Sequence, residues 1–179
     1  MVYVFFADGF EEIEAFAPVD ILRRAGVEVQ TVGIGNMTPV GSHGISTICD
    51  AGVDDMRTDE LEGIVLPGGM PGTKNLEESS HVRELVDFCA GSGKLIGAIC
   101  AAPSILGHMG LLKNRRAACF PDYERELDGA DVMREAICRD GNIITSRGAG
   151  TALEFGFALV AYLKGEAEAE RLRKMMQCV

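Results

Sequence analysis

The chain has 179 residues, of which 47% are hydrophobic and 25% charged, and its formal net charge at pH 7 is −10. This length and composition predict one soluble globular domain over residues 1–179. The acidic charge disfavours nucleic-acid binding, because phosphate recognition needs clustered lysine and arginine. No apolar run approaches the roughly 20 residues of a membrane span, and the N-terminus lacks a basic leader, so we expect a cytoplasmic protein that does not bind membranes.

The first half of the chain alternates strand-like and helix-like segments. Residues 2–7 (VYVFFA) read as a strand that is apolar on both faces. Residues 11–26 read as a helix with acidic residues at its start and two arginines near its end, which complement the helix dipole. A second strand is predicted over 27–34, and the glycine-punctuated residues 38–49 have the character of a hairpin.

The alternation continues in the second half. A buried strand is predicted over 63–69, ending in a glycine turn, and a helix over 80–93, with an N-cap serine and a terminal glycine. A strand over 94–99 leads into a helix over about 101–109. The remaining segments are a strand-like RRAACF, a DYEREL segment, a hairpin with Asp140–Gly141 at its turn, and a helical stretch from about 151.

Strands that are apolar on both faces and alternate with helices are typical of a parallel sheet covered by helices on both sides. The sequence therefore predicts an α/β sandwich of three layers, mostly parallel, with some antiparallel additions. In such sheets the chemistry gathers at the carboxyl edge, where strands end. Three predicted strand ends carry candidate groups, namely Asp8–Gly9, Pro67–Gly69 and Cys100.

Six cysteines are spread along the chain, without a CxxC pair or a Cys/His cluster of zinc-site spacing. We expect reduced thiols, and interpret five of them as small buried hydrophobes. Cys100 differs, because it stands at the corner between a predicted strand and a helix. The unpaired N–H groups of a helix N-terminus stabilise a thiolate, as at a nucleophile elbow. From this stretch alone, Cys100 is either a catalytic thiol or a packing cysteine.

Glu14 shares the apolar side of the first predicted helix. Ala17, Pro18 and Ile21 follow it at i+3, i+4 and i+7 and form one stripe with it. A buried carboxyl is costly unless it is paired or protonated, and burial raises its pKa, so Glu14 could be a neutral acid that donates a hydrogen bond. The alternative is a partly exposed first-turn residue that the helix dipole favours.

Four motifs resemble the ThiJ/PfpI superfamily, and in particular the branch that contains the Parkinsonism-associated protein deglycase and its bacterial relatives. They are DGFEEIEAFAPVDILRRAG, VLPGGMPGTKNL, GAICAAPSIL and ITSRGAGTALEF, and they keep the family's order and spacing between about residues 2 and 165. The resemblance implies a flavodoxin-like α/β sandwich and a homodimer. It also implies that Cys100 is the family's nucleophilic, oxidation-prone cysteine, that Glu14 hydrogen-bonds its sulfur, and that the N–H groups of Gly68 and Gly69 face it.

The sequence departs from the family's pattern at two positions. Ala101 replaces the histidine that follows the cysteine in the peptidase-like branch, so a Cys–His protease is not expected. Phe120 precedes Pro121 where part of the deglycase branch has a histidine, which removes the obvious general base.

Three further residues are candidates for the surroundings of the site. His43 lies in a segment that relatives place near the pocket or the dimer partner. Arg147 opens a loop near the site, where a structural role is the first interpretation. Cys119 is either a resolving thiol or a buried spectator. His81 and His108 are expected to be solvated.

Two functions are consistent with these residues. The first is a cysteine-dependent glyoxalase- or deglycase-like hydrolase acting on a small aldehyde or dicarbonyl, or on a glycated protein. In it Cys100 attacks carbon, the amides of Gly68, Gly69 and Ala101 hold the oxyanion, and Glu14 moves the proton. This chemistry needs no metal and no organic cofactor. The second is a redox-sensing, chaperone-like stress protein with little or no turnover, in which oxidation of Cys100 to the sulfinate is the signal.

Overall fold

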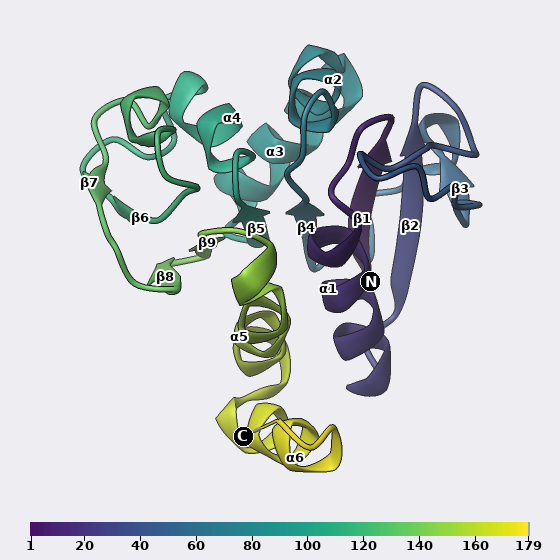
Figure 1. The fold of residues 1–179 in the computed structure, drawn as a ribbon, viewed down its shortest axis with the longest axis vertical. Coiled ribbons are helices and arrows are strands. Elements are labelled where there is room, and N and C mark those ends of the chain that lie inside the picture. The colour runs from purple at the N-terminus through teal and green to yellow at the C-terminus, as the bar shows by residue number, and fades with distance from the viewer. Residues whose placement is uncertain (179) are drawn as a thin grey trace.

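A computed structural model describes residues 1–178, and its centre is a seven-stranded sheet (Figure 1). The strand order is β3-β2-β1-β4-β5-β9-β8, and every neighbouring pair is parallel except β8 and β9. The strands are β1 (Val2–Ala7), β2 (Val29–Ile34), β3 (Ala51–Gly52), β4 (Gly63–Leu66), β5 (Leu95–Ile99), β8 (Ile137–Asp140) and β9 (Ile143–Ser146). A small separate sheet pairs β6 (Arg116–Ala117) with β7 (Asp131–Val132).

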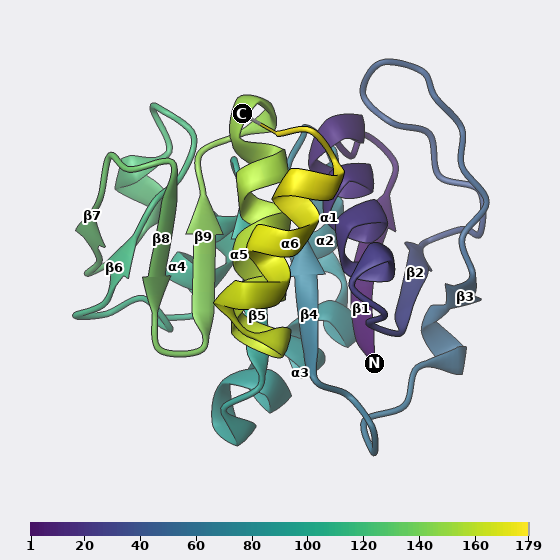
Figure 2. The same ribbon diagram turned by 90° about the horizontal axis from the view of Figure 1, so that it is seen from below.

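Helices cover both faces of the sheet, as Figure 2 shows. One face carries α1 (Glu12–Arg24) and α5 (Ala152–Lys164), with α6 (Glu166–Met175) packed against α5. The other face carries α2 (Gly72–Glu78), α3 (Ser80–Ser92) and α4 (Pro103–His108). Short 3-10 turns occur at η1 (Val53–Asp55), η2 (Glu124–Glu126) and η3 (Ala149–Thr151). The predicted three-layer α/β sandwich is confirmed.

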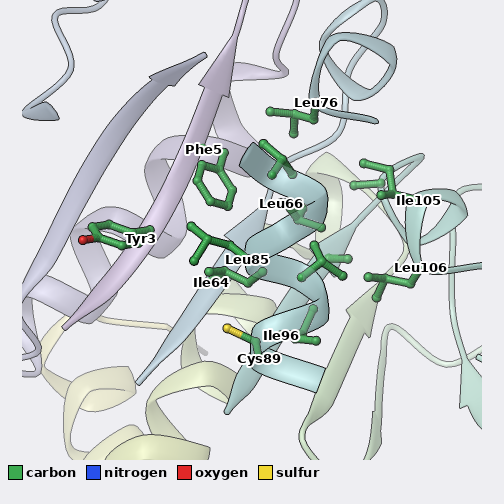
Figure 3. Close-up of a cluster of buried hydrophobic side chains, with 14 of the residues drawn as sticks. Tyr3, Phe5, Ile64, Leu66, Leu76, Leu85, Cys89, Ile96, Ile105 and Leu106 are labelled. Carbon is green, nitrogen blue, oxygen red and sulfur yellow. The ribbon is translucent and has the colours of Figure 1, made fainter. Parts of the chain in front are cut away.

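The central strand β1 is buried on both sides, as its apolar sequence predicts. Successive side chains of a strand point to opposite faces, so Tyr3 and Phe5 enter one hydrophobic cluster while Val4 and Phe6 enter the other. Figure 3 shows the first cluster, in which Phe5 lies with Leu66, Leu76, Ile105 and Leu106 from β4, α2 and α4. The sheet is therefore fixed between two apolar layers, which holds the strand ends that form the site.

Several expected boundaries are wrong in detail. Residues 38–49 form no hairpin beyond a single bridge between Val40 and Ser46. The N-cap of α3 is Ser79, one residue before the predicted helix, and α2 was not predicted at all. The helix after Cys100 begins only at Pro103, because Cys100 itself has a left-handed backbone conformation.

Across residues 1–178 no helix combines the length and the apolar character that crossing a membrane requires.

The C-terminal half of the chain needs two smaller corrections. The hairpin of β8 and β9 pairs Asp140 with Ile143, so its turn residues are Gly141 and Asn142, not Asp140 and Gly141. The helical stretch from 151 consists of a 3-10 turn and two helices, separated at Gly165, whose φ is 94°. A glycine accepts this φ without steric cost, so the break allows α6 to fold back onto α5.

Candidate active site

Cys100 occupies the corner between β5 and α4 with a strained backbone. Its φ is 65°, which is uncommon for a residue with a side chain and is often found at functional sites. The corner is held on two sides, because the N–H of Cys100 donates to the carbonyl of Ser146 at 2.9 Å and the N–H of Phe120 donates to the carbonyl of Cys100 at 2.8 Å. The thiol is half-buried at the carboxyl edge of the sheet, where the topology predicted chemistry.

Glu14 lies in the first turn of α1 with only 1% of its surface exposed. Its carboxylate oxygen Oε2 accepts the N–H of Gly68 at 3.0 Å. Of the two alternatives for Glu14, the buried acid is therefore correct and the exposed first-turn residue is wrong. The apolar stripe was the signal, because it turned this side of the helix toward the protein interior.

Gly68 is the point at which the cysteine and the carboxyl meet. A Cβ atom placed on Gly68 would lie 2.6 Å from the Cβ of Cys100 and 2.6 Å from Oε2 of Glu14. Both contacts are closer than any real Cβ tolerates, so only a glycine fits here. Its neighbour Gly69 has a φ of 90°, which turns the chain away toward α2.

The titration of the pair follows from burial and from mutual charge. Burial raises the pKa of Glu14 to about 7, with a further contribution from the charge of Glu11. Burial and the Glu14 carboxylate together raise the pKa of the Cys100 thiol to about 12. The thiol is held protonated by an ionised Glu14, whereas the acid form of Glu14 can donate a hydrogen bond to the sulfur. Since Glu14 keeps its proton up to about pH 7, both arrangements are available near neutrality.

Backbone N–H groups of Ala101 and Gly69 also act on the sulfur. Hydrogen bonds from both favour the charged form and lower the pKa of the Cys100 thiol, against the effects of burial and of Glu14. Donors that favour a thiolate in this way can also hold the oxygen of a carbonyl as it becomes negative. The expected pairing of Cys100 with Gly69 and Ala101 is thus present in space, while the N–H of Gly68 is directed to Glu14 instead.

Phe120 and Arg147 line the space beside the pair. A pocket of about 400 Å³ is formed by Phe120, Pro121, Ala136 and the residues 147–151. The Phe120 ring lies against Gly148, near the second oxygen of Glu14. A neighbouring pocket of about 600 Å³ also includes Arg147, whose guanidinium donates to the carbonyl of Arg134 at 3.3 Å. The walls of this space are therefore an aromatic ring, glycine-rich backbone and one guanidinium.

His43 is engaged with a different carboxylate. Its Nδ1 lies 2.8 Å from Oε2 of Glu12, and its N–H donates to Oε1 of the same residue at 2.8 Å, while 71% of its side chain is exposed. The hydrogen bond that the protonated His43 ring donates to the Glu12 carboxylate raises the pKa of His43. Near it lie two carboxylates, so that one side-chain oxygen or nitrogen atom from each of Glu11, Glu12 and His43 is within 4.8 Å of the other two. Carboxylate oxygens and imidazole nitrogens are atoms that can coordinate a divalent cation.

The remaining histidines differ in their surroundings. His81 is exposed, as expected. His108 is exposed as well, and its ring also bonds to two carboxylates, with Nδ1 2.6 Å from Glu77 and Nε2 3.0 Å from Glu126. The hydrogen bond with Glu77 in particular raises the pKa of His108. Within residues 1–178 the ring hydrogen bonds of His43 and His108 thus go to residues other than Cys100 and Glu14.

The other cysteines are free thiols that belong to the packing. Cys49, Cys89, Cys119 and Cys138 are buried, whereas Cys178 is half-exposed, so the expectation of five buried thiols is wrong at that residue. Burial raises the pKa of Cys119 to about 11. Cys119 packs in the cluster with α2–α4, while Cys100 packs against the opposite cluster. Its burial and its raised pKa favour the spectator interpretation of Cys119.

Glu11 is a residue of the site that the sequence analysis did not single out. It is the N-cap of α1, and its Oε2 accepts the N–H of Glu14 at 2.7 Å. The usual N-cap residues are aspartate, asparagine, serine and threonine, so the local sequence did not mark a glutamate as a cap. The nearness of Glu11 to Glu14 is local, whereas its nearness to the turn at Gly68 depends on the fold.

A cysteine at a strained strand-to-helix corner, paired with a buried carboxyl at the edge of a parallel sheet, defines a thiol-centred α/β protein. Residues 1–162 match the DJ-1/PfpI family, and the chain belongs to this family. The ThiJ/PfpI resemblance and the flavodoxin-like fold are thereby confirmed.

Similar proteins cover almost the whole chain. Protein DJ-1 homolog B of Arabidopsis thaliana is 36% identical over 94% of this chain. That relative is longer, and the match covers only 39% of its length. The glutathione-independent glyoxalase DJR-1.2 of Caenorhabditis elegans is 31% identical over 92% of this chain and 88% of its own. The crystal structure of Drosophila melanogaster DJ-1beta superposes with a TM-score of 0.95 and 31% identity, covering 99% of this chain and 97% of that one.

Proposed function

We propose that this protein is a cysteine-dependent glyoxalase- or deglycase-like hydrolase of small dicarbonyl compounds or of their adducts with proteins. The observation that carries the proposal is the contact of Cys100 with a buried, protonatable Glu14 beside the N–H groups of Gly69 and Ala101. A nucleophile, a proton carrier and oxyanion donors are the three groups that addition to a carbonyl needs. A relative named as a glutathione-independent glyoxalase supports the same chemistry.

The proposed reaction of methylglyoxal proceeds through covalent bonds to Cys100. The thiolate sulfur forms a bond to the aldehyde carbon, and the aldehyde oxygen takes a proton from Glu14, which gives a hemithioacetal. The Glu14 carboxylate then removes the hydrogen of that carbon as a proton and returns it to the neighbouring carbon, while the hydroxyl proton passes to the former ketone oxygen, which leaves a lactoyl thioester. Water breaks the carbon–sulfur bond, releasing lactate and the thiol, so that the sum is methylglyoxal plus water to lactate.

A redox-sensing, chaperone-like stress protein is the second candidate. Phe120, at the position where a histidine would supply a second base, favours it. In this function a peroxide oxidises the Cys100 thiolate to sulfenate and is reduced to water, and a second peroxide carries the sulfur to sulfinate. The N–H groups of Gly69 and Ala101 and the acid form of Glu14 would hold the sulfinate oxygens.

Methylglyoxal consumption with lactate formation tests the enzyme. The wild type, kept reduced and verified by intact mass, is expected to form lactate, and Cys100→Ser is expected to lower the rate at least about a hundredfold, because a serine hydroxyl is a far weaker nucleophile without a thiolate. Cys119→Ser is the matched control and should retain the wild-type rate. Equal background rates for the wild type and Cys100→Ser, with the wild type readily gaining two oxygens at Cys100, would reject the enzyme and favour the redox sensor.

We also propose that the protein is a homodimer that uses the start of α1. On α1, Ile13 is 56% exposed and Phe16 37% exposed, and Ile45, in the segment that follows Ser42 and His43, is 54% exposed. Hydrogen bonds from Ser42 to Phe10 and from His43 to Glu12 hold that segment against α1. Adjacent exposed apolar side chains of this kind mark protein contacts.

Light scattering after size exclusion checks this surface. The wild type is expected to elute as a dimer at micromolar concentration and Ile13→Glu as a monomer, because the dimer would have to bury the new charge. Met175→Glu, a change of the same kind on α6 at a side chain that is 49% exposed, should leave the dimer intact. A wild-type monomer, or an Ile13→Glu dimer of unchanged affinity, would exclude this interface.

A further inference from the structure

His108 is the last residue of α4, and its ring joins two segments that are distant from it in the sequence. Its Nδ1 lies 2.6 Å from a carboxylate oxygen of Glu77 in α2, and its Nε2 lies 3.0 Å from a carboxylate oxygen of Glu126 in η2. The neighbours cover part of this group, since 38% of the His108 side chain and 33% of the Glu77 side chain are exposed. One imidazole ring therefore bridges α2, α4 and η2.

Both contacts are hydrogen bonds only when the ring is protonated. An ionised carboxylate can only accept, whereas a neutral imidazole has one N–H and one bare nitrogen. A neutral His108 can thus donate to one carboxylate, and its bare nitrogen then faces a second acceptor. The imidazolium donates to both. The two bonds, that to Glu77 more than that to Glu126, raise the pKa of His108 against the opposing effect of burial.

Backbone hydrogen bonds connect this bridge to Cys100. The N–H of Phe120 donates to the carbonyl of Cys100 at 2.8 Å. The N–H of Tyr123 donates to the carbonyl of Phe120 at 3.1 Å, and the N–H of Glu126 donates to the carbonyl of Tyr123 at 3.0 Å. From Glu126 the ring of His108 leads back to α4, the helix that follows Cys100. The bridge therefore closes a loop of contacts that begins and ends at the corner of the thiol.

The η2 turn also forms part of a pocket wall. Glu124, its first residue, lines the pocket of about 600 Å³ together with Cys119 and Arg147. On its other side η2 touches α4 directly, because a Cβ on Gly107 would lie 2.2 Å from the carbonyl oxygen of Glu126. The distance between η2 and α4 thus sets one side of this pocket.

The charges that act most strongly on the ring are those of Glu77 and Glu126. α4 itself carries no second titratable residue. Arg83, on α3, donates to the backbone carbonyl of Glu77 and not to its carboxylate. The other charged residues of α2, of η2 and of the adjoining turn are Lys74, Glu78, Glu124, Arg125 and Asp128.

We propose that His108 is a pH-sensitive clamp, which holds α2 and η2 together at the end of α4 while its ring is protonated and releases η2 when the ring loses its proton to water. The neutral ring keeps the bond to Glu77, which is shorter and less exposed than the bond to Glu126. The clamp does not depend on any turnover at Cys100. It is fully present below the ordinary His pKa of 6.5 and is lost as the pH rises through the raised pKa of the folded protein.

Amide hydrogen exchange of η2 tests the clamp, with each rate divided by the intrinsic rate at the same pH. The N–H groups of Tyr123, Glu126 and Leu127 report on it, because each is bonded within this turn. In the wild type their protection should fall about threefold between pH 5.5 and 8.5, the size expected of a partly exposed ion pair. The midpoint should coincide with the titration of the His108 ring by NMR. The amides of β1 serve as the reference for changes in global stability.

Two substitutions separate the bridge from other effects of pH. The amide of Glu126→Gln can accept from the charged ring and can donate to the bare nitrogen of the neutral one, so protection should become equal at both pH values. His108→Gln should show the lower protection at both. His81→Gln, which removes an exposed histidine from α3, should behave as the wild type.

Three results would overturn the clamp. The first is wild-type protection of η2 that does not change with pH. The second is a pH dependence that persists undiminished in His108→Gln, because the ring would then not be its source. The third is a Glu126→Gln protein that still loses its protection at pH 8.5, where its bond to the ring needs no added proton.

Discussion

Replacing Glu14 with glutamine is expected to stabilise the protein at alkaline pH. Burial keeps the folded-state pKa of Glu14 at about 7, compared with an ordinary value of 4.5. As the pH rises, Glu14 therefore loses its proton in the unfolded chain before it does so in the folded protein. The free energy of unfolding is fully retained below pH 4.5 and decreases as the pH rises through about 7. This displacement corresponds to about 3 kcal/mol in the free energy of unfolding, and glutamine, being neutral, does not incur it.

Chemical denaturation at several pH values measures this effect. The difference between Glu14→Gln and the wild type should be near zero at pH 4.5, grow between pH 4.5 and 7, and reach about 3 kcal/mol by pH 8.5. Glu28→Gln, at an exposed glutamate, should show no such dependence. A Glu14→Gln variant that is no more stable than the wild type at pH 8.5 would mean that the folded protein ionises Glu14 at its ordinary pKa.

Replacing Gly68 with alanine is expected to damage both stability and thiol reactivity. The added Cβ would come within 2.6 Å of both the Cys100 Cβ and the Glu14 Oε2, and within 3.0 Å of the carbonyl of Ile99. The backbone of Ile99 and the corner at Cys100 are fixed by the sheet, so the strain cannot be relieved by a flexible side chain. We expect a loss of about 2 kcal/mol or more in the free energy of unfolding, in the upper part of the range for overpacked sites.

Alanine at Gly68 should also separate the cysteine from its carboxyl. Any movement that relieves the clash lengthens the contact between Cys100 and Glu14, so alkylation of Cys100 at pH 7 should slow by about tenfold, equivalent to one pKa unit. Gly91→Ala in α3 is the matched control, because a Cβ there would meet no described atom within 4 Å. That change should be neutral or stabilise the helix by about 0.5–1 kcal/mol. Wild-type reactivity in a stable Gly68→Ala protein would contradict the assigned geometry.

The two predictions describe one compromise. The site holds a carboxyl where water cannot solvate it, which lowers stability above neutral pH but supplies an acid next to a thiol. Cys100 itself is held at a φ of 65°, a further local cost that the sheet and the bond to Ser146 maintain. Functional sites often carry such costs, and substitutions that remove them gain stability and lose activity.

The fold and the position of Cys100 at the edge of the sheet could be predicted from local sequence. The apolar strand 2–7 and the alternating helices required a buried parallel sheet, since such strands can be covered only by helices on both faces. Cys100 followed from its place at the end of a strand, and the apolar stripe beside Glu14 indicated the burial of that carboxyl. These are properties of segments, and each segment carries its own periodicity and its own stop signal.

What the tertiary structure alone decided is which groups meet. Gly68 and Glu14 are 54 residues apart, and His108 and Glu77 are 31 apart, so no local pattern contains either contact. The direction of the Gly68 N–H toward Glu14 and the placement of Cys119 and Cys100 in different hydrophobic clusters both depend on how the strands are ordered in the sheet. Periodicity determines which face of a segment is buried, whereas contacts between distant segments are selected by the packing of the whole domain.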